Sequence, residues 1–307
     1  MLRVRHEVNG GPEVLFTEVV DAPEAGAGEV LIRVEAVGVT LPTVRKIREG
    51  SEPVSLGGEV AGEIVALGEG VTAFAVGERV TGLCFGHAYA EFAVLDTAMA
   101  SRIPGDASAV EAVALVRSGL VARGAYEAAR VKPGESVLVT AAAGGVGTLA
   151  LQYAKSGGAA RVVAAVSSAD KAAFVRGMGA DEVIRYEDTD WGGPYDVILD
   201  GVGGDLLGPA VRALATGGRL VAFSSGGGTV EAYELLVRGA SMIGFQMRAI
   251  AVGHPELYAR WLCELWRMRD SGTLRTAVHE EIPLAEAARA HALIEQRGNL
   301  GKVVLVP

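Results

Sequence analysis

The stretch Thr140-Ala-Ala-Ala-Gly-Gly-Val-Gly147 joins an apolar run to a helical segment. The run that leads into it, Val137–Thr140, is short and apolar and predicts a buried strand. The segment that follows, from Val146 to Ser156, has the spacing of a helix. A glycine-rich turn between a strand and a helix is typical of a dinucleotide-binding fold, and a glycine turn without any ligand is the alternative.

Four residues of this stretch have the properties of a phosphate cradle. Gly144 and Gly145 let the backbone turn tightly and approach a pyrophosphate. Gly147 allows the helix to pack closely on the strand. The helix opens at Val146, where free N–H groups and the positive end of the helix dipole favour an anion. We therefore predict that these residues bind the phosphates of a dinucleotide.

Strands and helices alternate in the chain downstream of this stretch. The further strands predicted by apolar runs are 161–166, 182–186, 196–200, 219–223 and 241–245. Such alternation requires right-handed crossovers, so it predicts an α/β fold with a doubly wound parallel Rossmann sheet. Upstream, residues 14–104 carry β-branched runs separated by glycine turns, which predict a mostly antiparallel β domain.

The length of 307 residues favours two domains. We expect the first domain, which would bind the substrate, to comprise residues 1–117 and to be completed by residues 251–307. The change from strand-like to helical spacing near residue 117 places the boundary, and residues 118–250 form the predicted dinucleotide-binding domain.

Charge and cysteine content exclude several classes of function. The net charge of −9 offers no broad basic surface to nucleic acid or to anionic lipid. Two cysteines are too few for a disulfide framework or for a four-thiolate zinc site. We find neither a signal peptide nor an apolar stretch of membrane-spanning length, so we expect a cytoplasmic protein.

The end of the second Rossmann strand indicates which dinucleotide binds. An NAD site usually has an acidic residue there, which binds the ribose 2′-hydroxyl, whereas this chain has Ser167 and Ser168. Lys171 follows within reach, so two hydroxyls and a cation favour the 2′-phosphate of NADPH. In the alternative interpretation Ser168 caps a helix and Lys171 is solvated. The missing acid also argues against a methyltransferase.

The whole chain resembles the medium-chain dehydrogenase/reductase superfamily, in its zinc-free quinone oxidoreductase and enoyl reductase branch. The resemblance rests on the glycine stretch, on the upstream motifs Gly57-Gly-Glu-Val-Ala-Gly62 and Val76-Gly-Glu-Arg-Val80, on Gly179–Tyr186, and on the terminal Gly301-Lys-Val-Val-Leu305. It implies a GroES-like substrate domain beside the Rossmann domain.

The resemblance also implies further contacts to NADPH. Tyr186 is expected near the adenosine 2′-phosphate, although an ordinary aromatic residue at a strand end would look the same. Lys302 is expected to contact the cofactor, although it could be a solvated residue at a strand edge. The other expected contacts are Phe223, Ser224, Phe245, Gln246 and Asn299.

Zinc-binding members of this superfamily carry a cysteine and a histidine at positions where this chain has Thr40 or its neighbours and Gly58. Neither of these residues is a zinc ligand, so no metal is expected. Glu59 remains, but a single carboxylate does not hold zinc.

Catalysis by such a protein needs a group that stabilises negative charge on the acceptor's oxygen. Thr40 is the leading hydroxyl donor, Arg45 the leading cation and Thr43 a weaker third, and each could instead be a turn or surface residue. We predict reduction of a quinone, conjugated enone or enoyl thioester by NADPH, with the final proton from water. The alternative is an inactive NADPH-binding protein with a structural or regulatory role. The apolar edge strand 241–245 favours a homodimer.

Overall fold

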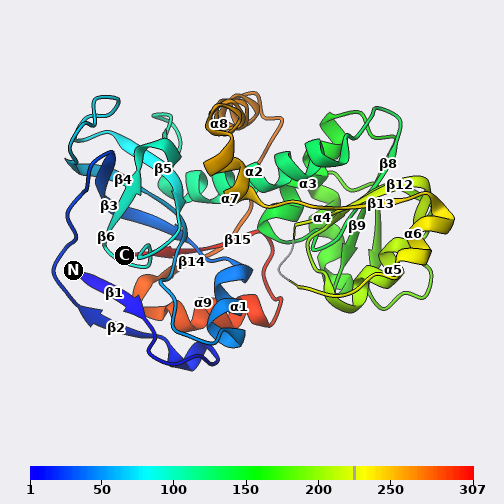
Figure 1. The fold of residues 1–307 in the computed structure, drawn as a ribbon, viewed down its shortest axis with the longest axis horizontal. Helices are drawn as coiled ribbons and strands as arrows, with labels where there is room; N and C mark the ends of the chain where they lie inside the picture. The colour runs from blue at the N-terminus through cyan, green and yellow to red at the C-terminus, as the bar shows by residue number, and fades with distance from the viewer. Residues whose placement is uncertain (224–225) are drawn as a thin grey trace. The chain divides into compact units, whose positions relative to one another are not determined.

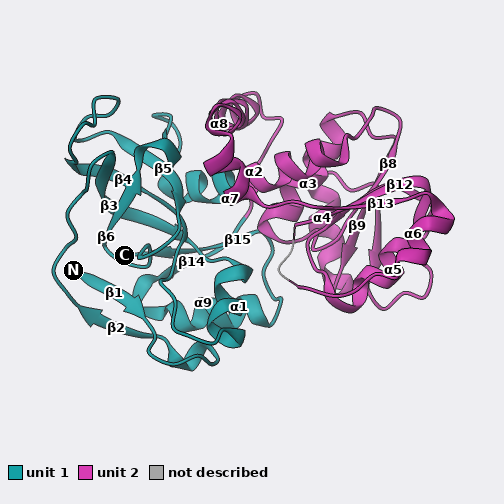
Figure 2. Cartoon of the chain, viewed as in Figure 1, with its two compact units in different colours: residues 1–117, 278–307 teal, residues 118–277 magenta. Residues whose placement is uncertain are grey.

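The structure is a computed structural model that describes residues 1–223 and 226–307 (Figure 1). The chain forms two compact units, which Figure 2 colours separately. Unit 1 comprises Met1–Arg117 and Val278–Pro307, and unit 2 comprises Ser118–Ala277. Ser224, one of the expected cofactor contacts, lies outside the described residues.

The described part of unit 2 contains a parallel sheet of six strands. They are β8 (Ser136–Val139), β9 (Arg161–Val166), β10 (Glu182–Arg185), β11 (Tyr195–Asp200), β12 (Leu214–Ala222) and β13 (Ser241–Gly244). Their spatial order is β10-β9-β8-β11-β12-β13, which is the doubly wound Rossmann order. The predicted α/β fold is therefore confirmed. The order reverses between β8 and β11, so ligands are expected beyond the carboxyl ends of these two strands.

Most helices of unit 2 connect its strands, and the last two follow β13. They are α3 (Gly145–Ser156), η3 (Ala169–Lys171), α4 (Ala172–Gly177), η4 (Gly204–Leu206), α5 (Leu207–Arg212), α6 (Ala232–Arg238), α7 (Met247–Gly253) and α8 (Pro255–Asp270). The long helix α2 (Ala109–Ala129) begins in unit 1 and ends in unit 2. The core between sheet and helices is fully buried at Leu138, Val163, Ile198 and Leu220. Among the described residues, no helix has the length and apolar character to cross a bilayer.

Unit 1 is built mainly from antiparallel strands, as the glycine-separated runs predict. Its larger sheet has the order β14-β15-β3-β4-β5-β7, and β6 pairs with β3. These strands are β3 (Glu29–Gly38), β4 (Gly58–Leu67), β5 (Arg79–Cys84), β6 (Phe92–Asp96), β7 (Ala100–Arg102), β14 (Val278–Pro283) and β15 (Lys302–Val306). A separate ribbon pairs β1 (Leu2–Arg5) with β2 (Phe16–Val19). The helical segments are η1 (Pro12–Val14), α1 (Leu41–Glu49), η2 (Thr97–Met99), η5 (Leu284–Glu286) and α9 (Ala287–Glu295).

Residues 251–277 lie in unit 2, whereas the sequence led us to expect them with the first domain. The reason is the packing of α8 against α2. Gly119 leaves room for the side chain of Leu265, because a Cβ there would lie 2.5 Å from Leu265 Cδ2. In addition, Arg123 Nε lies 3.0 Å from both carboxylate oxygens of Glu264. How the chain divides into independently folding domains stays a prediction.

Candidate cofactor and active site

The glycine stretch lies at the carboxyl end of β8 and opens α3. Ala141 has a φ of +49°, which is unusual for a residue with a side chain, and Gly144 N donates a hydrogen bond to Ala141 O at 2.9 Å. Gly144 occupies the N-cap position, so no side chain covers the first N–H groups of α3. At Gly147 a Cβ would lie 2.6 Å from Ala142 Cα, so any larger residue would force the backbone to shift. This geometry fits a bound pyrophosphate.

Tyr186, the residue after β10, fixes this turn from the side. Its hydroxyl oxygen accepts a hydrogen bond from Ala141 N at 2.9 Å. The bond ties the left-handed residue of the turn to the edge of the sheet. The sequence did not predict this contact, and the expected contact between Tyr186 and the 2′-phosphate stays a prediction.

A buried polar network closes the other side of the cradle. Thr140 Oγ1 donates to Asp200 Oδ1 at 2.7 Å and accepts from Gly201 N at 2.9 Å. Asp200 also accepts from Val202 N and Gly203 N. Burial raises the pKa of Asp200, and these hydrogen bonds oppose that shift. The network joins the ends of β8 and β11, which are the two strands at the switch point.

The predicted 2′-phosphate residues follow β9. Ser167 is exposed, Ser168 is half-buried, and Lys171 is buried in η3. Ser168 stands at the N-cap of η3, but its side chain makes no capping hydrogen bond. It hydrogen-bonds the carboxylate of Asp170 instead, which lowers the pKa of Asp170. The structure thus brings the three predicted residues together, while their contact with a phosphate stays a prediction.

Two aromatic residues lie after the neighbouring strands. The ring of Phe223 covers Gly201, where a Cβ would lie 3.0 Å from Phe223 Cε2. The ring of Phe245 lies against Gly124 of α2, and Phe245 N donates to Ala222 O at 2.9 Å. Gln246 is exposed and precedes α7.

Unit 1 holds the three predicted catalytic residues at the start of α1. Thr40 is the N-cap, and its hydroxyl lies 2.9 Å from that of Thr43. Thr43 Oγ1 donates to Gly57 O at 2.8 Å. Because this bond uses the Thr43 proton, the Thr40 hydroxyl is the donor between the two threonines. Both threonines are buried, whereas Arg45 is half-buried on the same helix.

The buried charges of unit 1 form a cluster that sequence reasoning missed. Lys302 Nζ pairs with the carboxylate of Glu59, and both residues are buried. Arg117 Nε lies 3.5 Å from the other oxygen of Glu59. Their pairing depends on β15 and β4 flanking β3 on its two sides, where Gly38 of β3 leaves room for both side chains. Asn299 donates to Gly301 O at 2.7 Å, so it shapes the turn before Lys302.

These residues do not fit a zinc ion. Glu59, the one potential ligand in the segment, is already paired with Lys302. The thiol of Cys84 donates to Gly86 O at 3.2 Å, and burial raises its pKa to about 11, which disfavours a zinc-binding thiolate. Across residues 1–223 and 226–307, no three His, Cys, Asp or Glu side chains are grouped as metal ligands would be.

Comparison with known proteins agrees with this fold. Residues 26–115 match the family model described as the alcohol dehydrogenase GroES-like domain, and residues 178–305 match that of the zinc-binding dehydrogenases. A quinone oxidoreductase from Pseudomonas aeruginosa is 33% identical over 99% of both chains. A 2-haloacrylate reductase from a Burkholderia species is 30% identical over 100% of this chain and 99% of its own.

A solved structure extends the similarity to three dimensions. The Escherichia coli quinone oxidoreductase complexed with NADPH superposes with a TM-score of 0.93 over 100% of both chains, at 28% identity. The Rossmann order of unit 2, the antiparallel sheet of unit 1 and the full-length relatives lead to one conclusion. The chain belongs to the medium-chain dehydrogenase/reductase superfamily, in its quinone oxidoreductase branch.

Proposed function

We propose that this chain, an NADPH-dependent oxidoreductase, reduces a small quinone or conjugated enone or enoyl compound without a metal ion. The observation that carries the proposal is the cradle at the switch point, whose turn is fixed by the hydrogen bond between Tyr186 and Ala141. The names of the relatives, quinone oxidoreductase and 2-haloacrylate reductase, support this class of acceptor.

The cofactor is held by unit 2. The N–H groups at the start of α3 bind the pyrophosphate, and Ser167, Ser168 and Lys171 bind the 2′-phosphate. The rings of Phe223 and Phe245 flank the nicotinamide half. Bound NADPH supplies the hydride, so the protein's part is to bind, orient and exclude water.

The acceptor's oxygen is polarised by a residue at the start of α1. Thr40 is the leading candidate, but its hydroxyl donates to Thr43 Oγ1 in this structure. The Thr40 hydroxyl would have to break this hydrogen bond before it could donate to the acceptor. Arg45, on the same helix, is the alternative source of positive charge. If Thr40 is the donor, Thr40→Val lowers kcat strongly and Arg45→Gln does not. If Arg45→Gln lowers kcat strongly and Thr40→Val does not, Arg45 polarises the acceptor's oxygen.

We propose a reaction without a metal ion because the described residues of this region offer no suitable set of zinc ligands. Thr40 and Gly58 occupy the positions at which zinc-binding relatives have ligands, and the pairing of Glu59 with Lys302 leaves no carboxylate free there. Extended incubation with a strong chelator is expected to leave the activity unchanged. An activity that falls with chelation and returns with zinc would overturn this part of the proposal.

A homodimer joined at β13 would cover an exposed apolar surface. β13 is an edge strand of the sheet, and Met242 on it is exposed. Next to β12, helix α6 exposes Tyr233, Leu236 and Val237, with 71%, 73% and 56% of their surface accessible. A second copy would pair its own β13 with this edge. Light scattering that gives the monomer mass at micromolar concentration would contradict the homodimer.

Steady-state turnover separates this function from that of an inactive binding protein. The purified chain is mixed with NADPH and a panel of a quinone, a conjugated enone and an enoyl thioester. We expect NADPH oxidation that depends on the acceptor. NADPH binding without oxidation by any of them would favour the structural or regulatory alternative. The cytoplasmic location stays a prediction.

A further inference from the structure

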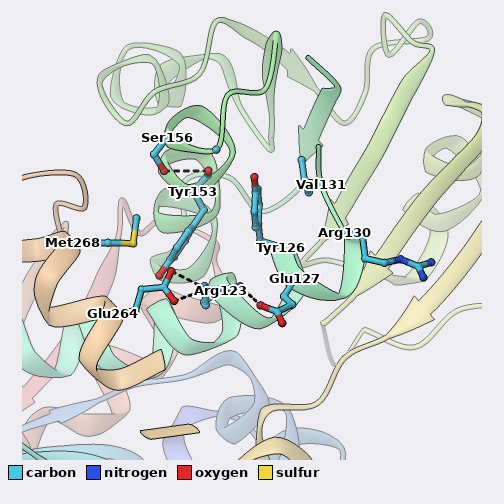
Figure 3. A pocket seen from close by; sticks show the side chains of 10 residues that line it. Arg123, Tyr126, Glu127, Arg130, Val131, Tyr153, Ser156, Glu264 and Met268 are labelled. Atoms are coloured by element: carbon cyan, nitrogen blue, oxygen red, sulfur yellow. Dashed lines mark hydrogen bonds and ion pairs between the residues drawn. The ribbon is translucent and has the colours of Figure 1, made fainter. Parts of the chain in front are cut away.

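Unit 2 contains a cavity away from the glycine cradle. Its volume is about 430 Å³, it is open to solvent, and residues from the last turns of α2, α3 and α8 line it (Figure 3). Tyr126 comes from α2, Tyr153 and Ser156 come from α3, and Glu264 and Met268 come from α8. None of the residues that we assign to NADPH lines this cavity.

Tyr153 gives the cavity an unsatisfied polar group. Only 3% of its surface is accessible, and its hydroxyl has no hydrogen-bond partner in the described part of the chain. Figure 3 shows the hydroxyl end of this ring beside the carboxylate of Glu264. Burial raises the pKa of Tyr153, and the Glu264 carboxylate raises it further, so the hydroxyl stays protonated. A ligand that bonds this oxygen would satisfy it.

Tyr126 and Tyr153 form an aromatic wall. Their ring centroids lie 6.1 Å apart with planes inclined by 33°. Gly157 lets Tyr126 approach α3, because a Cβ there would lie 2.7 Å from Tyr126 Cζ. The faces of such rings attract cations.

The charges around the wall favour a cation as well. Glu264 and Glu127 share one guanidinium, that of Arg123, whose Nε lies 3.0 Å from Glu264 and whose Nη1 lies 2.5 Å from Glu127. Arg123 also lies over the ring of Trp261 at 5.5 Å, so both carboxylates and the ring already engage it. Figure 3 shows the side chain of Arg130 pointing away from the two tyrosines. Arg130 lines the cavity as well, but beside the two rings the carboxylates of Glu264 and Glu127 face the single guanidinium of Arg123.

The helix ends add to this potential. α2 ends at Ala129, α3 at Ser156 and α8 at Asp270, and each helix contributes lining residues from its last turns. The C-terminal end of a helix carries a partial negative charge. Three such ends at one cavity favour a bound cation and disfavour an anion.

We propose that this cavity binds a small primary ammonium ion with an aromatic or alkyl body. Its N–H groups donate to Tyr153 Oη and to the free lone pairs of Glu264. Its apolar body lies against Tyr126 and the thioether of Met268. A primary ammonium suits the site better than a quaternary one, because it can donate hydrogen bonds to Tyr153 Oη and to a Glu264 carboxylate oxygen. A quaternary ammonium has no N–H group to donate. This inference goes beyond the proposed function and does not depend on it.

Calorimetric titration of the full chain with benzylamine, protonated at neutral pH, tests the site. Benzyl alcohol and benzoate are the neutral and anionic probes of similar shape. We expect benzylamine to bind at least about tenfold more tightly than either. Absence of benzylamine binding, or equal binding of the three probes, would overturn the proposal.

Variants then locate the binding. Glu264→Gln is expected to weaken benzylamine binding about tenfold and Tyr153→Phe severalfold. Glu256→Gln removes the same charge from the exposed first turn of α8 and should have no effect. Tyr153→Phe deletes a hydroxyl without a partner, so it should fold normally, which thermal melting checks. Unchanged binding in both Glu264→Gln and Tyr153→Phe would contradict the assignment. NADPH affinity, measured in parallel, should not change.

Discussion

Tyr186 Oη lies 2.9 Å from Ala141 N and accepts its hydrogen bond. The two residues are 45 positions apart in sequence, yet the parallel sheet brings the end of β10 to the turn after β8. Ala141 has a left-handed backbone, which costs free energy in a residue with a Cβ. The tyrosine therefore helps to hold the glycine-rich turn in its strained form.

Tyr186→Phe is expected to weaken NADPH binding. The variant keeps the ring but leaves Ala141 N without its acceptor, at a cost of about 1 kcal/mol, or roughly fivefold in Kd. Fluorescence titration with NADPH measures the change. Tyr233→Phe, on an exposed residue of α6, is the matched control and should leave Kd unchanged. Equal NADPH affinities in the two variants would show that the Tyr186 hydroxyl does not contribute to cofactor binding.

Gly147→Ala should abolish measurable NADPH binding and destabilise unit 2. The added methyl group would meet Ala142 Cα at 2.6 Å, so α3 must shift away from β8. A cost of about 1–3 kcal/mol in the free energy of unfolding is expected from urea denaturation. Gly177→Ala in α4 adds the same methyl group where no atom lies within 4 Å, and both properties should stay near wild type.

Lys171→Ala should reduce the preference for NADPH over NADH. The loss of a cation beside the 2′-phosphate weakens NADPH binding about tenfold and leaves NADH binding nearly unchanged. The ratio of kcat/KM for the two cofactors reports the preference. Lys155→Ala, which removes an exposed cation paired with Asp181, is the control. A ratio unchanged by Lys171→Ala would show that the cofactor assignment is wrong.

His291 should make the protein less stable at acidic pH. Its ring is buried against Tyr89, with Nε2 3.1 Å from the hydroxyl, and burial lowers its pKa to about 4. Glu295 opposes this shift, and His6 adds to it. Between about pH 6.5 and pH 4 the unfolded chain binds a proton that the folded chain does not, so stability falls as pH falls through this range.

The expected loss from this histidine is about 2 kcal/mol between pH 7.5 and pH 5. Urea denaturation at both pH values measures it. In His291→Gln the pH dependence should be smaller by that amount, whereas His254→Gln, at an exposed histidine, should retain it. An identical pH dependence in wild type and His291→Gln would mean that folding does not shift the pKa of His291.

Local patterns were enough to predict the Rossmann unit. Strand 161–166 has its predicted bounds, because a continuous apolar run marks a buried strand. Helix α1 was not predicted because it is short and lies within residues 14–104, whose β-branched runs favour strands. Residues 251–277 lie in unit 2, and the sequence does not show the contact between Gly119 and Leu265 that helps to place them there.

The glycines of the cradle could be predicted because they form one contiguous motif in the sequence. The bond between Tyr186 and Ala141, the pairing of Lys302 with Glu59 and the use of the Thr40 proton by Thr43 all depend on contacts across the fold. The spacing of residues along the chain does not show which of them come into contact when the chain folds.

The most direct test of the account follows the hydride itself. NADPH carrying deuterium at the transferable C4 position is incubated with the protein and a conjugated enone or quinone, and mass spectrometry examines the reduced product. For the enone, we expect one deuterium on carbon in each product molecule. For the quinone, we expect acceptor-dependent oxidation of the labelled cofactor. Labelled NADPH that binds to the protein and remains unoxidised with every acceptor would contradict it.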